Sequence, residues 1–433
     1  MKLQTLVLMG LRLFPWAGGI HWSTGMRFPL PSTGRGIEGE GWARSEQSSR
    51  RTSACQQSSS LFRWRHRLAV PPLTPALSPL RGEGAPLHAP QDFRVPGEWQ
   101  GRILAGLLAV CAVGAAAAEK EKHETFLTLE TAGRDFVMQG EYYGTISGGE
   151  KQIGAQVIAL GKGIFRAVIL PGGLPGSGWD TKAKIEIDGA TDGERVEFSG
   201  PNGKGTITEI FPKTKPAAGG TLEMKGSLSS LGAFEMKKIV RKSVTLGDKP
   251  PDGAIVLFNG SNTDAFPGGH MDERKLLESG PRTKQKFTNY TLHVEFLLPF
   301  RPTARGQERG NSGVYMQDRY EIQVLDSFGL QGLNNECGGI YSKTAPSLNM
   351  CFPPLQWQTY DIDFEAAKFD PAGKKTKNAI VTVRHNGVII HYRQEIDGPT
   401  PAGIPETPEG GPIQLQGHGN PVFYQNIWVV ERK

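Results

Sequence analysis

The stretch TLHVEFLL at residues 291–298 alternates apolar and polar side chains. Successive side chains of a β-strand point to opposite faces, so Leu292, Val294, Phe296 and Leu298 share one face and His293 and Glu295 the other. The same period of two recurs in YEIQVLD (320–326), YDIDF (360–364) and PIQLQGHG (412–419). One apolar face per strand predicts antiparallel sheets that pack on each other as a sandwich.

Two further patterns refine this sandwich, which we place at residues 254–433. The Asn-Gly pair in HNGV (385–388) separates two apolar runs, and it predicts a tight hairpin. The outward faces carry Glu, Gln, Asn, Tyr and His, which make directional hydrogen bonds with hydroxyl-rich ligands. A sugar-binding face is therefore one interpretation, and an ordinary polar outer face is the other.

A second β-rich region precedes the sandwich, at residues 119–246. Short runs such as RVEFSG (195–200) and GTITEIF (205–211) end at Gly, Pro or Asn, and DFVM (135–138) opens another such run. This spacing predicts an antiparallel sandwich or barrel. In its loop GGLPGSGWD, Trp179 either stacks on a sugar at the loop tip or anchors the loop. The segment GDKPPDGA (247–254) links the two regions.

The first 118 residues differ from the rest of the chain. Residues 1–94 show no sustained periodicity of apolar and polar residues, and we interpret them as translated upstream DNA or as a disordered extension. Residues 95–118 have a short basic flank, an apolar stretch and Ala116–Ala118 before Glu119, as in a secretory signal peptide. We therefore expect a periplasmic or secreted bacterial protein that begins near Glu119. An internal apolar helix in a genuine N-terminal extension is the alternative.

Charge and hydropathy exclude two classes of protein. The first 118 residues hold 13 basic and 6 acidic side chains, whereas the remainder holds 36 basic and 37 acidic ones. The neutral body gives no support for a nucleic-acid partner. No apolar run reaches about 18 residues, so we expect no membrane span in the mature protein.

Two cysteines, Cys337 and Cys351, lie in the expected mature chain. An even pair in an exported protein, separated by a loop, predicts one disulfide. Metal binding by this pair is the less favoured alternative, because no His or further Cys stands nearby at ligand spacing.

Three segments resemble one family. They are GNSGVYMQDRYEIQVLDSFG (310–329), the run from Glu336 to Phe364, and GPIQLQGHGNPVFYQNIWV (411–429). They are similar to the bacterial 3-keto-disaccharide hydrolase family, and GAIVLFNGSNTDAF (253–266) resembles the start of its domain, with Phe266 in place of the usual Trp. The resemblance implies an all-β, concanavalin A-like jelly roll.

The resemblance also implies a reaction, the cleavage of a glycosidic bond in a sugar that carries a ketone at C3. A base removes the acidified C2 proton, the group at C1 departs, and water adds across the double bond. A non-catalytic carbohydrate-binding module is the alternative. A conventional endo-glucanase is a third interpretation, which Gln323 disfavours because an amide cannot serve as nucleophile or acid.

The candidate catalytic residues are Glu321, His418 and Asp326. Glu321 and Gln323 share a face in E-x-Q-x-x-D, and Asp326 could instead cap a turn. His418 lies in QGHGN, where the family usually has Asp before the His and this chain has Gly417. A histidine there could transfer a proton or simply form part of a turn.

The predicted substrate-binding residues are Asn311, Gln323, Lys343 and Gln416. Asn311 resembles the start of the family's Asn-Ser-Gly motif, and its alternative role is a turn at a strand start. Lys343 would stabilise an enolate oxygen or remain solvated. No cofactor is expected with certainty. A divalent metal, for instance at His293 and Glu295, stays open because no HxH or HExxH spacing exists.

Overall fold

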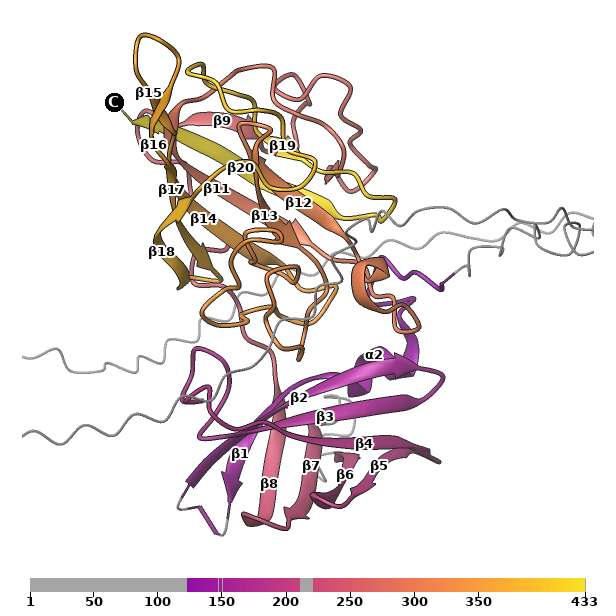
Figure 1. The fold of residues 1–433 in the computed structure, drawn as a ribbon. Coiled ribbons are helices and arrows are strands. Elements are labelled where there is room, and N and C mark those ends of the chain that lie inside the picture. The colour runs from indigo at the N-terminus through magenta and orange to yellow at the C-terminus, as the bar shows by residue number, and fades with distance from the viewer. Residues whose placement is uncertain (1–122, 147, 150, 211–220, 433) are drawn as a thin grey trace, which may run out of the picture. The chain divides into compact units, whose positions relative to one another are not determined.

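The chain is all-β in the computed structural model, which describes residues 123–146, 148–149, 151–210 and 221–432 (Figure 1). Its helices within that part are the six-residue α2 (Gly133–Met138) and the 3₁₀ turn η2 (Gly306–Glu308). None of the described helices is long and apolar enough to cross a membrane. The predicted signal peptide and the segment before it lie outside the described residues.

The first region is a closed barrel of eight antiparallel strands in chain order, in which β8 pairs back with β1. In β5, Val196 and Phe198 point into the barrel core while Arg195 and Glu197 face outward, as a period of two requires. The barrel alternative of the sequence prediction is therefore the correct one. Its strands are β1 (Gly140–Ile146), β2 (Lys151–Gly161), β3 (Ile164–Pro171), β4 (Ile185–Asp192), β5 (Arg195–Gly200), β6 (Gly203–Ile210), β7 (Thr221–Leu228) and β8 (Gly232–Ile239).

One run in this region that the sequence predicts as a strand is helical. The residues of DFVM belong to α2, whose Met138 is buried and accepts a hydrogen bond from Tyr142 Oη at 2.7 Å. Asp135 Oδ2 accepts the backbone N–H of Gly163 at 3.0 Å, which ties the helix to the β2–β3 turn. A four-residue apolar run does not distinguish helix from strand, which is why its periodicity misled the prediction.

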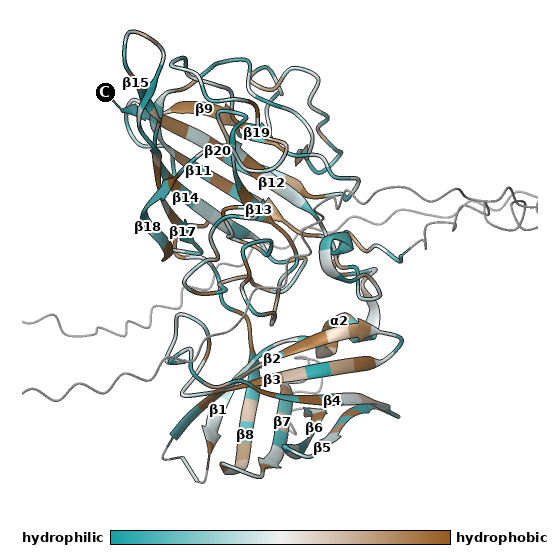
Figure 2. Ribbon diagram, viewed as in Figure 1, coloured by the Kyte–Doolittle hydropathy of each residue, from teal (hydrophilic) through white to brown (hydrophobic). Residues whose placement is uncertain are grey.

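The larger sheet of the sandwich has the order β10-β20-β11-β14-β17-β18, and β9 also pairs with β20. Leu292, Val294, Phe296 and Leu298 are all buried on its inner face, as the alternation predicts. Figure 2 shows apolar residues recurring along these strands. Their bounds are β9 (Ile255–Phe258), β10 (Leu277–Glu278), β11 (Asn289–Leu297), β14 (Gln358–Glu365), β17 (Ala379–His385), β18 (Val388–Ile396) and β20 (Phe423–Arg432); the hairpin β15 (Lys368–Phe369) and β16 (Lys375–Lys377) stands apart.

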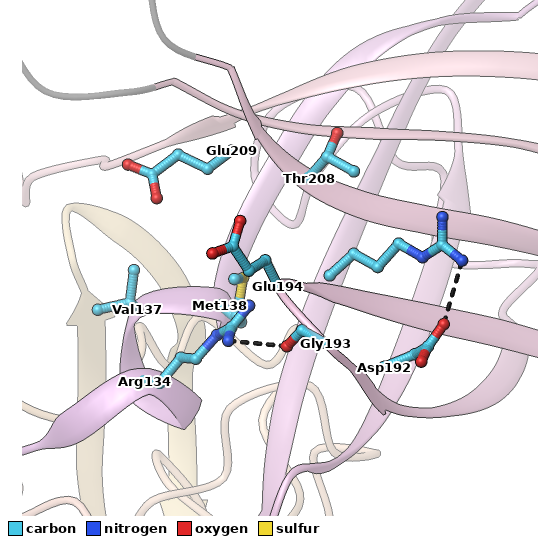
Figure 3. Close-up of a pocket in the computed structure, with 9 residues that line it drawn as sticks. Arg134, Val137, Met138, Asp192, Gly193, Glu194, Thr208 and Glu209 are labelled. Carbon is cyan, nitrogen blue, oxygen red and sulfur yellow. Dashed lines mark hydrogen bonds and ion pairs between the residues drawn. The ribbon is translucent and has the colours of Figure 1, made fainter. Parts of the chain in front are cut away.

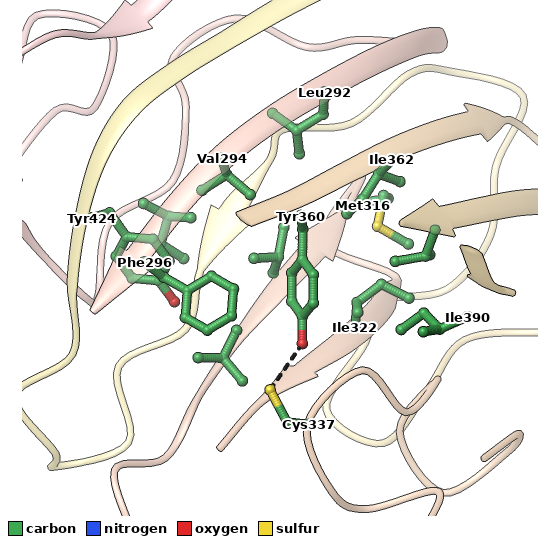
Figure 4. Packing of buried hydrophobic residues seen from close by; sticks show 14 of the residues in the cluster. Leu292, Val294, Phe296, Met316, Ile322, Cys337, Tyr360, Ile362, Ile390 and Tyr424 are labelled. Atoms are coloured by element: carbon green, nitrogen blue, oxygen red, sulfur yellow. Dashed lines mark hydrogen bonds between the residues drawn. The ribbon is translucent and has the colours of Figure 1, made fainter. Parts of the chain in front are cut away.

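The smaller sheet has the order β13-β12-β19 and supplies the other side of the core. Its strands are β12 (Ser312–Met316), β13 (Tyr320–Val324) and β19 (Gln414–Leu415). Ile322 and Val324 of β13 pack in the same apolar cluster as Val294 and Tyr360 of the larger sheet, as Figure 4 shows for several members. Two packed antiparallel sheets are consistent with the jelly roll that the resemblance implied.

The predicted Asn-Gly hairpin joins β17 to β18. Asn386 and Gly387 have φ of 52° and 83°, the two positive values that a type I′ turn requires. A Cβ on Gly387 would lie 2.3 Å from Val244 Cγ2, so this turn also needs the space that glycine leaves.

The outer face of the larger sheet, which carries His293 and Glu295, is covered by another part of the chain. Both are buried, at 0% and 1% exposure, because the segment 243–248 crosses over them. Thr245 Oγ1 donates to Asp361 Oδ2 at 2.8 Å, and the backbone N–H of Gly247 donates to Glu295 Oε1 at 2.6 Å. Asp361 and Glu295 therefore hold the connecting segment against the sheet.

The structure also corrects the predicted disulfide. Cys337 and Cys351 are both buried and both free. Cys337 Sγ lies 3.1 Å from Tyr360 Oη (Figure 4), and Cys351 Sγ lies 3.4 Å from the carbonyl oxygen of Phe352. The thiols therefore fill space in the core as small apolar groups do, each against a nearby oxygen, rather than closing a loop covalently.

Candidate functional site

The side of the smaller sheet that faces away from the core is polar. Glu321 of β13 stands opposite Tyr315 of β12, and Tyr315 stands opposite Gln414 of β19. Directly opposed residues of antiparallel strands lie on the same face, so these three side chains share it. This polar face carries the predicted residues Glu321, Gln323 and Gln416.

Glu321 is the most perturbed carboxyl group of this face. Its side chain is 2% exposed, and burial raises the pKa to about 7 although a hydrogen bond from Tyr315 opposes the shift. Its carboxyl lies over Gly313, where a Cβ would meet Glu321 Oε1 at 2.1 Å. The glycine of the Asn-Ser-Gly motif therefore makes room for the carboxyl group.

Tyr315, which the sequence analysis did not select, completes this arrangement. Its Oη lies 2.8 Å from Glu321 Oε2 and 2.9 Å from the carbonyl oxygen of Pro401. One hydroxyl proton can serve only one of these two acceptors. A proton on Glu321 Oε2 resolves the conflict, since Glu321 then donates to Tyr315 and Tyr315 donates to Pro401. The geometry thus fits a neutral Glu321, in agreement with its raised pKa.

Side-chain amides form a chain at the β13 end of the face. Gln307 Oε1 accepts hydrogen bonds from Asn311 Nδ2 and from Gln323 Nε2, both at 2.9 Å. Gln307 Nε2 donates to the carbonyl oxygen of Asn335 at 2.8 Å. Asn311 Oδ1, however, is buried without a partner among the described residues. An unpaired buried acceptor is costly, so this oxygen is suited to receive a ligand hydroxyl.

Gln416 and His418 follow β19 along the chain. Gln416 Nε2 lies 3.4 Å from Tyr315 Oη, and Gln416 Oε1 is a second buried acceptor without a partner in the described part of the chain. His418 is exposed. A Cβ on Gly417 would lie 3.1 Å from the Cα of Gly280, so this chain has little room for the Asp that the family usually places before its His.

Two predicted residues have other partners. Asp326 is buried and forms an ion pair with Arg309 at 2.6 Å, while its Oδ1 accepts the N–H of Phe328 at 3.2 Å. The turn-capping alternative therefore describes its contacts. Lys343 Nζ pairs with the exposed Asp397 at 2.6 Å, and no hydrogen bond within the described residues joins Lys343 to the polar face.

Other candidate positions lie outside this face. A cavity of about 840 Å³ in the barrel region is lined by Arg134, Glu194 and Glu209 among others, and Figure 3 shows Arg134 bonded to the carbonyl of Gly193. It contains none of the predicted residues. Trp179 Nε1 donates to the carbonyl oxygen of Ala183 at 2.9 Å, which matches the loop-anchor alternative. Within the described residues no group of three His, Cys, Asp or Glu is arranged to hold a metal ion.

The domain is a two-sheet β-sandwich, and one face of its smaller sheet carries acid, amide and phenol groups. Residues 253–430 match the family model of the 3-keto-alpha-glucoside-1,2-lyase-like domain. This part of the chain belongs to that family, and it is a glycosidase-like domain. The comparison with curated proteins found no match.

Two solved structures from Parabacteroides distasonis are similar to this chain, and both are described as candidate glycosyl hydrolases. One is 33% identical, with a TM-score of 0.39, and covers 42% of this chain and 85% of its own. The other is 17% identical, with a TM-score of 0.32, and covers 42% of this chain and 95% of its own.

Proposed function

We propose that the sandwich domain cleaves the glycosidic bond of 3-keto-disaccharides or other 3-keto-glycosides. The observation that carries this proposal is the Glu321 carboxyl group, whose pKa lies at about 7 in a family domain of glycosidase type. A group that titrates near neutrality can both give and take a proton under working conditions. The buried acceptors Asn311 Oδ1 and Gln416 Oε1 support a ligand that brings hydroxyl donors.

The elimination step of the reaction needs two proton transfers. The C3 ketone acidifies the C2 proton, and a base removes it while electrons form the C1–C2 double bond and the C1–O bond breaks. The departing oxygen takes a proton, and water then adds its hydroxyl to C1 and its hydrogen to C2. Neutral Glu321 is suited to protonate the leaving oxygen, and we assign the base to His418, in the loop after Gln416.

Access to Glu321 is part of this proposal. Its carboxyl is covered in the structure, and Pro401 lies against Tyr315 beside it. Thr400 Oγ1 accepts the backbone N–H of Glu321 at 3.0 Å, so the segment around 400 lies along the edge of β13, next to Pro401 and Tyr315. A substrate that reaches Glu321 must therefore displace this segment from the polar face.

The proposal is tested by incubating the full chain with 3-keto-trehalose and, separately, with trehalose. We expect release of sugar from the ketone alone, because trehalose lacks the acidified C2 proton. Release from trehalose at a similar rate would indicate an ordinary glycosidase, and release from neither would contradict the proposed reaction.

A non-catalytic carbohydrate-binding module is the second candidate. The near-complete burial of Glu321 favours it, because binding at the more open β19 side of the face would not require contact with that carboxyl. Calorimetric binding of 3-keto-trehalose without any cleavage would identify this function.

A separate proposal concerns export and the division into domains. We propose that the mature protein begins near Glu119 and is periplasmic or secreted, with the barrel and the sandwich as separate domains at residues 119–246 and 254–433. N-terminal sequencing of the protein from its native host tests this, and peptides from residues 30–90 would contradict it.

A further inference from the structure

The polar face extends beyond β19. An isolated β-bridge pairs Arg282 with Gln414, and Thr283 N donates to the carbonyl oxygen of Ile413 at 2.8 Å. The segment around Arg282 therefore adds an edge to the smaller sheet. Because opposed residues share a face, Glu321, Tyr315, Gln414 and Arg282 form one row across four strands. The row is roughly 14 Å long at about 4.8 Å per strand.

A second row runs beside the first. Gln323 stands opposite Gly313, and Gln416 N donates to the carbonyl oxygen of Gly313 at 2.8 Å. The Arg282–Gln414 bridge places Gly280 two residues further along, opposite Gln416, and Gly280 N donates to the carbonyl oxygen of the adjacent Leu415. Both rows thus begin at β13 and end at the edge segment, at Arg282 and Gly280.

A cavity of about 300 Å³ lies at that end. Besides Gly280 and Arg282, His270 and Glu278 line it, and His270 Nδ1 is 3.1 Å from Glu278 Oε1. Arg282 pairs with Asp318 at 2.9 Å. The Arg282 charge is paired with Asp318, and Glu278 lies beside His270, so the cavity favours a neutral ligand with hydroxyl groups over a phosphate or another anion.

We propose that this cavity binds the second sugar of the substrate, the one that leaves from C1, while the keto sugar lies against Glu321. The inference rests on the proposed function and adds the direction of the substrate across the strands. Arg282, His270 and Glu278 supply donors and acceptors for hydroxyl groups of the leaving sugar. A Cβ on Gly280 would meet nothing within 4 Å, so the backbone beside the cavity is open and a sugar ring can approach it.

The test compares two substrates in His270→Ala and Arg282→Ala variants of the full chain. 3-Keto-trehalose carries a sugar as its leaving group, whereas methyl 3-keto-α-glucoside carries methanol. We expect KM for 3-keto-trehalose to rise by about tenfold in each variant, because a ligand hydrogen bond is lost. The methyl glycoside does not reach the cavity, so its kcat/KM should stay within about twofold.

Arg393→Ala is the matched control, since Arg393 is an exposed residue paired with Glu365 on the other sheet. It should change neither substrate. Because Arg282→Ala leaves the buried Asp318 unpaired, thermal unfolding is measured for each variant, and His270→Ala carries the test if Arg282→Ala unfolds. Unchanged KM for 3-keto-trehalose, or equal losses with both substrates, would overturn the inference. If the wild type cleaves neither substrate, the proposed function fails and the inference falls with it.

Discussion

At the scale of single residues, the chemistry of the site depends on which atom holds one proton. Tyr315 Oη has two acceptors within 2.9 Å, Glu321 Oε2 and the carbonyl oxygen of Pro401. When Glu321 is protonated, Tyr315 can donate to Pro401, and when the carboxyl is ionised, Tyr315 can donate to Glu321 instead. Burial provides the raised pKa, and the phenol limits how far it rises.

Replacing Tyr315 with Phe removes the hydrogen bond that lowers the pKa of Glu321. The pKa should therefore rise above about 7. In the proposed reaction Glu321 is the acid, so activity should fall as pH rises through this pKa, and the falling limb of kcat/KM should move to higher pH in Tyr315→Phe. Rates measured from pH 5 to pH 9 check this. An unmoved limb, or one displaced to lower pH, would separate Tyr315 from the acid.

At the scale of elements, the pairing of β12 with β13 builds the site. Gly313 and Gln323 are opposed, and the carboxyl of Glu321 leans over Gly313 rather than over its own partner Tyr315. A strand that carried a side chain at 313 would have to push this carboxyl aside. The glycine is thus a requirement of side-chain packing, since its backbone has no positive φ.

Gly313→Ala tests this requirement. The new Cβ would lie 2.1 Å from Glu321 Oε1, so the carboxyl should move and turnover should fall by at least about tenfold. The loss of stability should stay near 1–3 kcal/mol, the usual cost of overpacking. Gly200→Ala is the control, because its Cβ would meet only Ile187 Cγ2 at an ordinary 3.7 Å. Wild-type turnover in Gly313→Ala, measured beside a urea melt, would refute the placement of Glu321.

The sequence predicts most of the strands, because period two is a local property of the chain. It also predicts that Glu321 and Gln323 share a face. It does not predict that Tyr315 and Pro401 close over Glu321, since those contacts join segments up to 86 positions apart and depend on the register between strands. The disulfide prediction failed for a related reason: spacing along the chain does not reveal that both thiols are packed within the core.

At the scale of the whole molecule, a buried charge cluster attaches the segment between barrel and sandwich. His293 Nδ1 lies 2.6 Å from Asp361 Oδ1, and His293 Nε2 lies 3.4 Å from Glu295 Oε1. The ring of Trp428 stacks on the imidazole. Burial lowers the pKa of His293, but hydrogen bonds to the two carboxylates outweigh it and raise the pKa to about 9. The cluster is therefore held together by a positively charged imidazole at neutral pH.

This cluster predicts a pH dependence of stability. The folded pKa of His293 lies above its ordinary value of 6.5, so its contribution is complete below about pH 6.5 and is lost as pH rises through about 9. The loss is on the order of 3 kcal/mol. Urea unfolding of the wild type should show this decline, and His293→Gln should flatten it. An equally steep decline in the variant would assign it to other groups.

The proposed reaction depends on proton exchange between Glu321 and the substrate, and Glu321→Gln removes that exchange. The amide keeps the shape and the contact with Tyr315 but cannot give up or take the proton. We expect kcat for 3-keto-trehalose to fall by about 10²–10⁴, with the melting temperature close to that of the wild type. A correctly folded variant that cleaves 3-keto-trehalose within about threefold of the wild-type rate would contradict this dependence.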